Sequence, residues 1–292
     1  MKFSSVAKFG RFENRLTEGS ADRLAMYRDP QFADEIGEHV DQLVAHRQIL
    51  SLDVFDTLLL RDNSSELSRF IEIGRRIAKH TATVTGREVN DIDGFVAREL
   101  GTKATYRASR LVNGCREGSL TEIHQTASGV LSGSHAYADA FVEIELTYES
   151  ETVTLNPFWI DVIERHRENG GRVLLLTDMY MHASQVAQLL ERAGLERQDY
   201  DFLISSADEK LSKASGQIFS FAEDSLSLMS DDFVHFGDSL RGDFVQPRRS
   251  GWTAMHLPIS HAAIAARKDD HMKSLSRVVS EFGFTPSVAC PQ

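Results

Sequence analysis

Cysteine is scarce in this sequence: the only two among 292 residues are Cys115 and Cys290. So few cysteines, so far apart, exclude a disulfide framework and a cysteine-rich metal site. Long apolar runs are also missing, and because none reaches about 18 residues, no transmembrane helix is predicted. The first residues lack the sustained apolar segment of a signal peptide. We therefore expect a cytoplasmic protein with no membrane partner.

Positive charge is in short supply as well. The chain has 32 Lys and Arg against 43 Asp and Glu, a net charge of −11. Such a surface suits nucleic acid poorly unless basic residues cluster. The clusters present, Arg75-Arg76 and Arg248-Arg249, are small and more typical of a solvated face. We expect no nucleic-acid partner, and the eleven histidines show no metal-ligand spacing.

What the sequence does have is organised around Gln48–Arg61, which reads QILSLDVFDTLLLR. A short apolar run that ends in a carboxylate, here Asp53, is typical of a strand buried on both faces of a parallel sheet. Asp53 would then lie at the carboxyl end of the strand, where open α/β sheets bind ligands. Taken alone, the stretch also fits an acid that merely ends a core strand.

Three later stretches also combine apolar runs with polar side chains. Arg172–Asp178 reads RVLLLTD, Ser205–Phe219 carries a lysine in a Ser-Lys-Ala-Ser-Gly turn, and Phe233–Phe244 reads FVHFGDSLRGDF. Further strands are expected at 172–177, 201–205, 233–236 and 252–257, and helical patterns separate them. This alternation predicts an α/β fold with a doubly wound, Rossmann-like parallel sheet of five strands.

About 110 residues lie between the first two strands, far more than a crossover connection needs. Their periodicity is helical, which indicates a small all-helical domain inserted into the sheet domain. The expected division is an N-terminal helical extension at 1–47, a core at 48–61 and 156–258, a helical cap at 62–155, and a C-terminal helix and tail at 259–292. In that last segment the helical pattern covers His261–Arg267.

In their order along the chain, the four polar stretches resemble the four motifs of the haloacid dehalogenase (HAD) superfamily, over about Gln48–Leu257. LDVFDTLLLR and LTDMYM are similar to the signatures of a group of predicted hydrolases that read FDxFDTLL…R and later SDMYL. The resemblance implies a C1-type cap and a Mg²⁺-dependent phosphatase or phosphotransferase. Its substrate would be a small phosphorylated metabolite, and by association with surface-polysaccharide genes a sugar phosphate.

The resemblance also implies a role for each polar residue. Asp53 would attack phosphorus and carry an aspartyl-phosphate intermediate. Substrate-binding roles fall to Thr57, which also supports the nucleophile loop, and to Thr177, Asp178 and Lys213. Thr177 and Lys213 also count as catalytic, Lys210 is a weaker candidate than Lys213, and Asp178 has a helix-capping alternative. The Mg²⁺ ligands would be Asp53, the backbone carbonyl of Phe55, and Asp238, with Asp243 in an outer position.

One position departs from the superfamily's phosphatases, which usually place an acid–base aspartate two residues after the nucleophile. Phe55 stands there, and Asp56 follows where those enzymes have glycine. Asp56 could supply the proton transfer as a catalytic residue, or it could tie the loop while the cap or solvent supplies the proton.

Two further functions stay open at this stage. One is a metal-independent dehalogenase, which carries an aromatic residue at the position of Phe55. It would need a cap arginine, with Arg75, Arg76, Arg98, Arg107 and Arg110 as candidates. The other is a catalytically weak binding protein on the HAD fold. The paired acids Asp238 and Asp243 favour the phosphatase, because a dehalogenase needs no metal.

Overall fold

The computed structural model describes residues 12–112 and 114–291, so the first eleven residues of the expected N-terminal extension lie outside it. Its central sheet is parallel, with strand order β5-β4-β1-β6-β7. The strands are β1 Ile49–Leu52, β4 Arg172–Thr177, β5 Phe202–Ser205, β6 Phe233–Gly237 and β7 Thr253–His256. The predicted five-stranded, doubly wound α/β fold is confirmed, with β1 at the centre.

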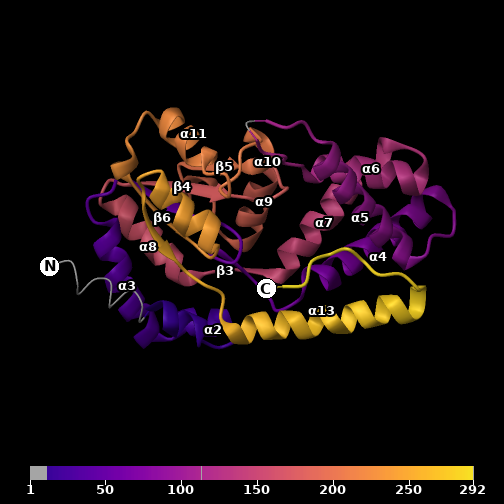
Figure 1. Ribbon diagram of the computed structural model, residues 1–292, viewed down its shortest axis with the longest axis horizontal. Coiled ribbons are helices and arrows are strands. Elements are labelled where there is room, and N and C mark those ends of the chain that lie inside the picture. Colours follow the sequence, from indigo (N-terminus) through magenta and orange to yellow (C-terminus); the bar gives the residue numbers. More distant parts are fainter. Residues whose placement is uncertain (1–11, 113, 292) are drawn as a thin grey trace.

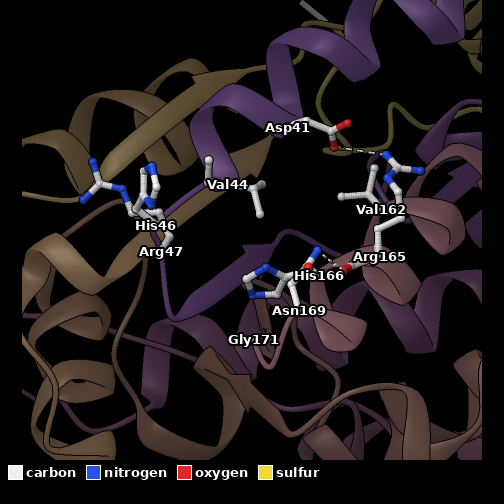
Figure 2. Close-up of a pocket in the computed structure, with 10 residues that line it drawn as sticks. Asp41, Val44, His46, Arg47, Val162, Arg165, His166, Asn169 and Gly171 are labelled. Atoms are coloured by element: carbon white, nitrogen blue, oxygen red, sulfur yellow. Dashed lines mark hydrogen bonds and ion pairs between the residues drawn. The ribbon is translucent and has the colours of Figure 1, made fainter.

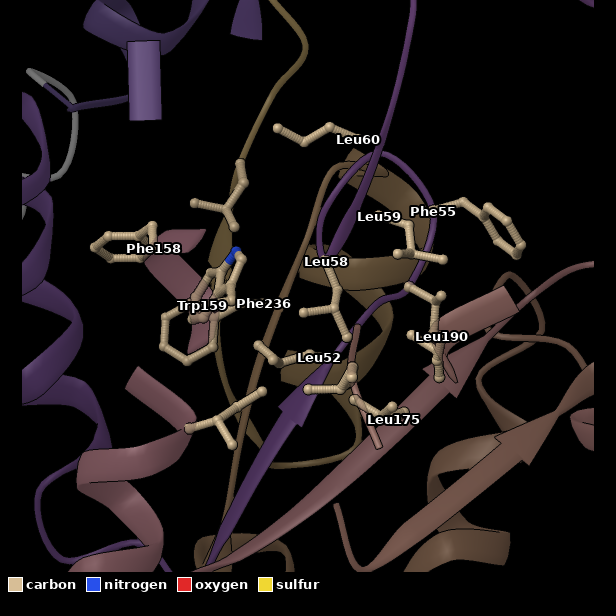
Figure 3. Packing of buried hydrophobic residues seen from close by; sticks show 14 of the residues in the cluster. Leu52, Phe55, Leu58, Leu59, Leu60, Phe158, Trp159, Leu175, Leu190 and Phe236 are labelled. Carbon is tan, nitrogen blue, oxygen red and sulfur yellow. The ribbon is translucent and has the colours of Figure 1, made fainter. Parts of the chain in front are cut away.

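Both faces of this sheet are buried, which explains why its strands read as nearly unbroken apolar runs. On one face, Leu52, Leu175 and Phe236 belong to a cluster with side chains of α3 (Pro30–Val44), α8 (Pro157–Glu168) and α9 (Ala183–Ala193). Figure 3 shows the Trp159 ring of α8 beside Phe236, with 5.0 Å between ring centroids. On the other face, strand residues pack against α11 (Gln217–Leu226).

Four helices lie between the first two strands of the sheet, as the sequence predicts: α4 Glu66–Thr85, α5 Asp91–Ala108, α6 Leu120–Ser132 and α7 Ala138–Thr152. They gather at one end of the molecule (Figure 1). The contact between α4 and α5 is close because both contribute a glycine: a Cβ on Gly94 would come within 1.9 Å of the Gly74 carbonyl oxygen. We call these helices the cap.

A two-stranded antiparallel sheet that the sequence did not predict joins the cap to the core. It consists of β2 (Leu59–Arg61) and β3 (Val153–Leu155). The helical pattern of the sequence runs on to Thr154, but α7 ends at Thr152 and the chain enters β3. Strands of three residues are too short to show the alternation by which a strand is recognised in a sequence.

Both ends of the chain pack along these two parts. The N-terminal region contributes α2 (Arg23–Arg28) and α3. At the other end, α13 (His261–Phe282) is far longer than the predicted helix and runs from the core to the far end of the cap, where the chain folds back (Figure 1). The backbone N–H and the hydroxyl of Ser287 donate to Glu99 of α5, at 2.7 and 2.6 Å. The tail is thus fastened to the cap.

The shorter elements of the described residues include η1 His135–Tyr137, η2 Arg197–Asp199, α10 Ser206–Glu209, η3 Ser230–Asp232, η4 Leu240–Val245 and α12 Gln246–Arg249. Among the helices of residues 12–112 and 114–291, none combines the length and apolarity that crossing a membrane requires.

A cavity of about 590 Å³ opens where α3 and α8 end, beside the amino ends of β1 and β4 (Figure 2). His46, Arg165 and His166 are among its lining residues. It lies at the opposite edge of the sheet from Asp53, and the predicted site residues lie around a different cavity.

Candidate active site

The carboxyl edge of the sheet holds a cavity of about 280 Å³ that most of the predicted residues line. Asp53, Thr177, Asp178, Lys213, Asp238 and Asp243 all line it. They come from the loops after β1, β4 and β6 and from the loop before α11. Four segments that are far apart in the sequence therefore meet at one polar pocket, as the motif order predicts.

Asp53, directly after β1, is held by a buried lysine. The Lys213 Nζ donates to Asp53 Oδ1 at 2.5 Å and to Asp243 Oδ1 at 2.6 Å. Burial raises the pKa of Asp53 to about 7 even though Lys213 works in the opposite direction. For Lys213, burial acts to lower the pKa, but the two carboxylates have the larger effect, so the pKa of Lys213 is raised. Lys210 donates to the Glu117 backbone carbonyl instead, so the lysine at the carboxylates is Lys213.

Asp243 has both carboxylate oxygens engaged. Its Oδ2 accepts from the Ser239 backbone N–H at 2.9 Å, and its Oδ1 accepts from His235 Nε2 at 3.0 Å as well as from Lys213. His235 in turn lies 2.8 Å from the Ser51 hydroxyl through its Nδ1. Because Nε2 of His235 donates to Asp243, Nδ1 of the neutral ring carries no proton and accepts a hydrogen bond from the Ser51 hydroxyl. This geometry suits an outer position that orients Lys213.

Glycine is needed at position 237 because of that carboxylate. A Cβ there would come within 2.4 to 2.6 Å of the Asp243 side chain. The Gly-Asp pair that ends β6 thus has a packing reason in addition to its turn chemistry.

Three carboxylates form a cluster that suits a hard cation. Asp53, Asp238 and Asp243 each offer an oxygen, and these oxygens lie within 4.8 Å of one another. Burial raises the pKa of Asp238 well above its usual range, and the charge of Asp53 raises it further. Within residues 12–112 and 114–291, no basic side chain forms an ion pair with Asp238. Crowded oxygen donors with surplus negative charge are the ligands that Mg²⁺ prefers, so the residues present fit that ion.

Of the two predicted threonines, Thr177 lines the cavity and Thr57 lies behind it. Thr177 ends β4 and lines the cavity beside Asp178. Thr57 is only 1% exposed and does not line the cavity, although it lies close enough to Asp53 to lower the pKa of that carboxyl. This position suits support of the nucleophile loop better than contact with a substrate.

Asp56 is engaged by two arginines. Arg267 donates to its Oδ1 and Oδ2 at 2.7 and 3.1 Å, and Arg23 donates to Oδ1 at 2.7 Å. Burial alone would raise the pKa of Asp56, but the arginines hold it well below its usual range. A carboxylate that stays ionised and has its oxygens occupied is a poor proton donor. The geometry therefore favours the loop-tying role of Asp56 over the acid–base role.

Arg61 ends the central motif and lines the cavity, although the motif alone assigned it no role. It comes from β2, and its guanidinium lies over the Phe55 ring at 4.3 Å from the centroid. Its Nη2 is 3.4 Å from Glu149 Oε2. By contrast, none of the five cap arginines considered for a dehalogenase lines the described cavity. Arg98, for example, is buried against Glu145.

The cap contacts this edge through the loop after β4. The Leu120 N–H of α6 donates to the Tyr180 carbonyl at 2.6 Å, and the Tyr180 hydroxyl donates to Glu145 of α7 at 3.0 Å. The Met-Tyr-Met segment at 179–181 thus includes the tyrosine that joins core and cap.

No protein-family model matches the chain, and no curated protein matches it. Among solved structures, the chain is similar to a HAD phosphatase from Thermococcus onnurineus, at 17% identity and a TM-score of 0.46 over 71% of this chain and 84% of that one. A HAD family enzyme from Bacteroides thetaiotaomicron, solved with magnesium and inorganic phosphate, is similar at 12% identity and 0.46, over 72% and 93%. A hydrolase from Streptococcus pneumoniae TIGR4 is similar at 15% identity and 0.37, over 74% and 92%.

Proposed function

We propose that the protein is a Mg²⁺-dependent phosphatase or phosphotransferase of the HAD superfamily that acts on a small phosphorylated metabolite. The observation that carries this proposal is the contact of Asp53 with Lys213 in a cavity that Thr177 and Asp238 also line. A carboxylate at a strand end, beside a buried cation and further carboxylates, is equipped for attack on a phosphoryl group.

In the first step, an Asp53 oxygen forms a bond to phosphorus while the bond from phosphorus to the leaving oxygen breaks. In the second, water attacks phosphorus, inorganic phosphate leaves and the Asp53 carboxylate is regenerated; in a transferase, an acceptor hydroxyl replaces water. Lys213 offsets the negative charge that accumulates where carboxylate meets phosphate, and the Thr177 hydroxyl binds a phosphoryl oxygen. Mg²⁺ held by Asp53 and Asp238 would supply further charge neutralisation.

The leaving oxygen needs a proton, and Asp56 is poorly placed to supply it. Glu117, on the cap loop before α6, is a better candidate. Burial raises its pKa to about 7, and the nearby charge of Asp178, a cavity residue, adds to the rise. A carboxyl with this pKa can give up a proton and take it back near neutral pH. Glu117 lies near Asp178 and does not itself line the cavity, so proton transfer by this residue stays part of the proposal.

The test is hydrolysis of p-nitrophenyl phosphate with and without Mg²⁺, by wild type and by Asp53→Asn. Asp41→Asn is the matched control, because Asp41 lies at the other edge of the sheet, where it pairs with Arg165. Turnover that needs Mg²⁺, survives in Asp41→Asn and falls by roughly 10³-fold or more in Asp53→Asn supports the proposal.

The same assay separates the alternatives. Halide release from a 2-haloacid without metal, and no phosphatase activity, would identify a dehalogenase instead. No turnover of either substrate, with Mg²⁺ bound, would identify a binding protein. A panel of sugar phosphates then tests the expected substrate class, which rests on association alone.

A further inference from the structure

Asp56 is bound by residues from both ends of the chain. Arg23 of α2 lies 33 positions before it, and Arg267 of α13 lies 211 positions after it. Their side chains are 4% and 12% exposed, so both guanidinium groups are largely withdrawn from water. Two buried guanidinium groups thus share the single carboxylate of Asp56, which lies three residues after Asp53 in the sequence.

The backbone at Asp56 needs support. Its φ is +62°, in the left-handed region that side chains other than glycine seldom occupy. Arg23 donates both to the Asp56 carboxylate and to its backbone carbonyl, and the Asp56 N–H donates to the Leu59 carbonyl at 2.7 Å. These bonds fix the peptide groups on both sides of the residue, and so the direction of the chain from Asp53 to Thr57.

The N-terminal region also supports the opposite side of the cavity. Glu13 Oε1 lies 2.8 Å from His256 Nδ1, and His256 Nε2 lies 2.9 Å from the Asp238 backbone carbonyl. A single terminal region thus contacts the loop of the nucleophile through Arg23 and the loop of Asp238 through Glu13 and His256. Random surface packing would not be expected to select these two loops.

We propose that the chain termini outside the sheet domain are working parts of the catalytic centre, with Arg23 and Arg267 as positioning residues that hold the nucleophile loop through Asp56. The expected effect of these residues on kcat rests on the proposed function. We call the two arginines bound to Asp56 the clamp. The clamp also explains why an aspartate stands where the phosphatases of the superfamily have glycine: the bonds to Asp56 stabilise a left-handed backbone that glycine would adopt without support.

The experiment uses the full chain with Arg23→Met, Arg267→Met and Asp56→Asn. Arg15→Met is the matched control, because Arg15 pairs with Glu35 in the same terminal region and is 37% exposed. Three quantities are measured: kcat and KM for p-nitrophenyl phosphate, and the amide hydrogen exchange rate of the segment 53–60. We expect kcat to fall on the order of 10²-fold in the three clamp variants, with KM changed little, because a misplaced nucleophile costs rate rather than affinity.

Exchange at 53–60 should quicken at least tenfold in the clamp variants and stay unchanged in Arg15→Met. Arg23→Lys and Arg267→Lys should restore stability better than they restore kcat, because lysine keeps the charge but not the two-pronged geometry. These variants also serve if the methionine variants do not fold.

Folded clamp variants with the kcat and the exchange of Arg15→Met would overturn the inference. If the proposed function is wrong, the result is different: the wild-type protein hydrolyses no phosphate ester. In that case, quickened exchange confined to the clamp variants would still support the clamp, and unchanged exchange would reject it.

Discussion

The interior of the cap and the carboxyl edge of the sheet both bury carboxylates, but they neutralise them to very different extents. In the cap, Glu145 accepts from Arg98 at 2.8 and 2.5 Å, from His124 at 2.8 Å and from Tyr180 at 3.0 Å. Burial would raise the pKa of Glu145, yet Arg98 holds it well below its usual range. At the sheet edge, burial wins and raises the pKa of both Asp53 and Asp238.

This difference separates a structural charge from a functional one. A buried carboxylate with a complete set of hydrogen-bond donors has its charge compensated by protein groups alone. A buried carboxylate whose charge is only partly offset, in a cavity, still needs a cation or a proton. The pattern of compensation is the one that the proposed Mg²⁺ site at Asp53 and Asp238 requires, whereas Glu145 holds the cap together.

The largest expected effect comes from breaking the complete network. Arg98→Met should lower the free energy of unfolding by about 3–5 kcal/mol, because it leaves Glu145 charged and poorly paired in the interior. Methionine still covers the Phe70 ring, over which the Arg98 guanidinium lies at 3.4 Å. Urea unfolding measures the change.

The matched variant is Arg98→Met combined with Glu145→Gln, which removes the orphaned charge together with its partner. It should be more stable than Arg98→Met alone. If Arg98→Met unfolds at the wild-type urea concentration, the network does not hold the cap as described.

A smaller effect should appear at the sheet edge when pH is varied without metal. Asp53 has an ordinary pKa of 3.8 and a folded pKa of about 7. Between these values the folded state binds more protons than the unfolded state, so its stability falls as pH rises from about 4 through 7. Mg²⁺ at about 100 times its Kd should restore about 2.7 kcal/mol at the high end, because it binds the ionised form.

Thermal unfolding with EDTA and with Mg²⁺, across pH 5 to 8, tests this prediction. Asp53→Asn should make the metal-free profile less steep, with the raised pKa values of Asp238 and Glu117 leaving a residual slope. It should also lose most of the Mg²⁺ effect, since a ligand is removed. Metal-free wild type that grows more stable over the same range would contradict it.

The sequence predicted the sheet and most of the cavity because both leave local signals. An apolar run that ends in a polar side chain marks a strand end wherever it occurs, and parallel strands bring such ends to one edge. Asp53, Thr177 and Asp238 were placed in this way. Lys213 was preferred to Lys210 from its turn alone, and the contact with Asp53 agrees with that choice.

The clamp on Asp56 had no local signal. Its partners lie 33 and 211 residues away, and in the sequence a single arginine in a helix cannot be told from a solvated one. The length of α13 was missed for a related reason: its buried residues are only Ala263, His271 and Val278, too few to make an apolar stripe. The sequence therefore carried no signal for long-range pairing, nor for elements too short or too polar to show a periodic apolar pattern.

The smallest effect should come from an ion pair with the same chemistry as the cap network but in contact with water. Arg192 of α9 donates to Glu143 of α7 at 2.6 Å, which joins core and cap at the surface. The two side chains are 35% and 56% exposed, so solvent and salt screen their attraction. Arg192→Met should therefore change the free energy of unfolding by only about 0.2–1 kcal/mol, and the change should shrink as salt is added. If this variant costs as much as Arg98→Met in the same urea titration, then burial is not what distinguishes the two pairs, and the contrast between cap and sheet edge fails with it.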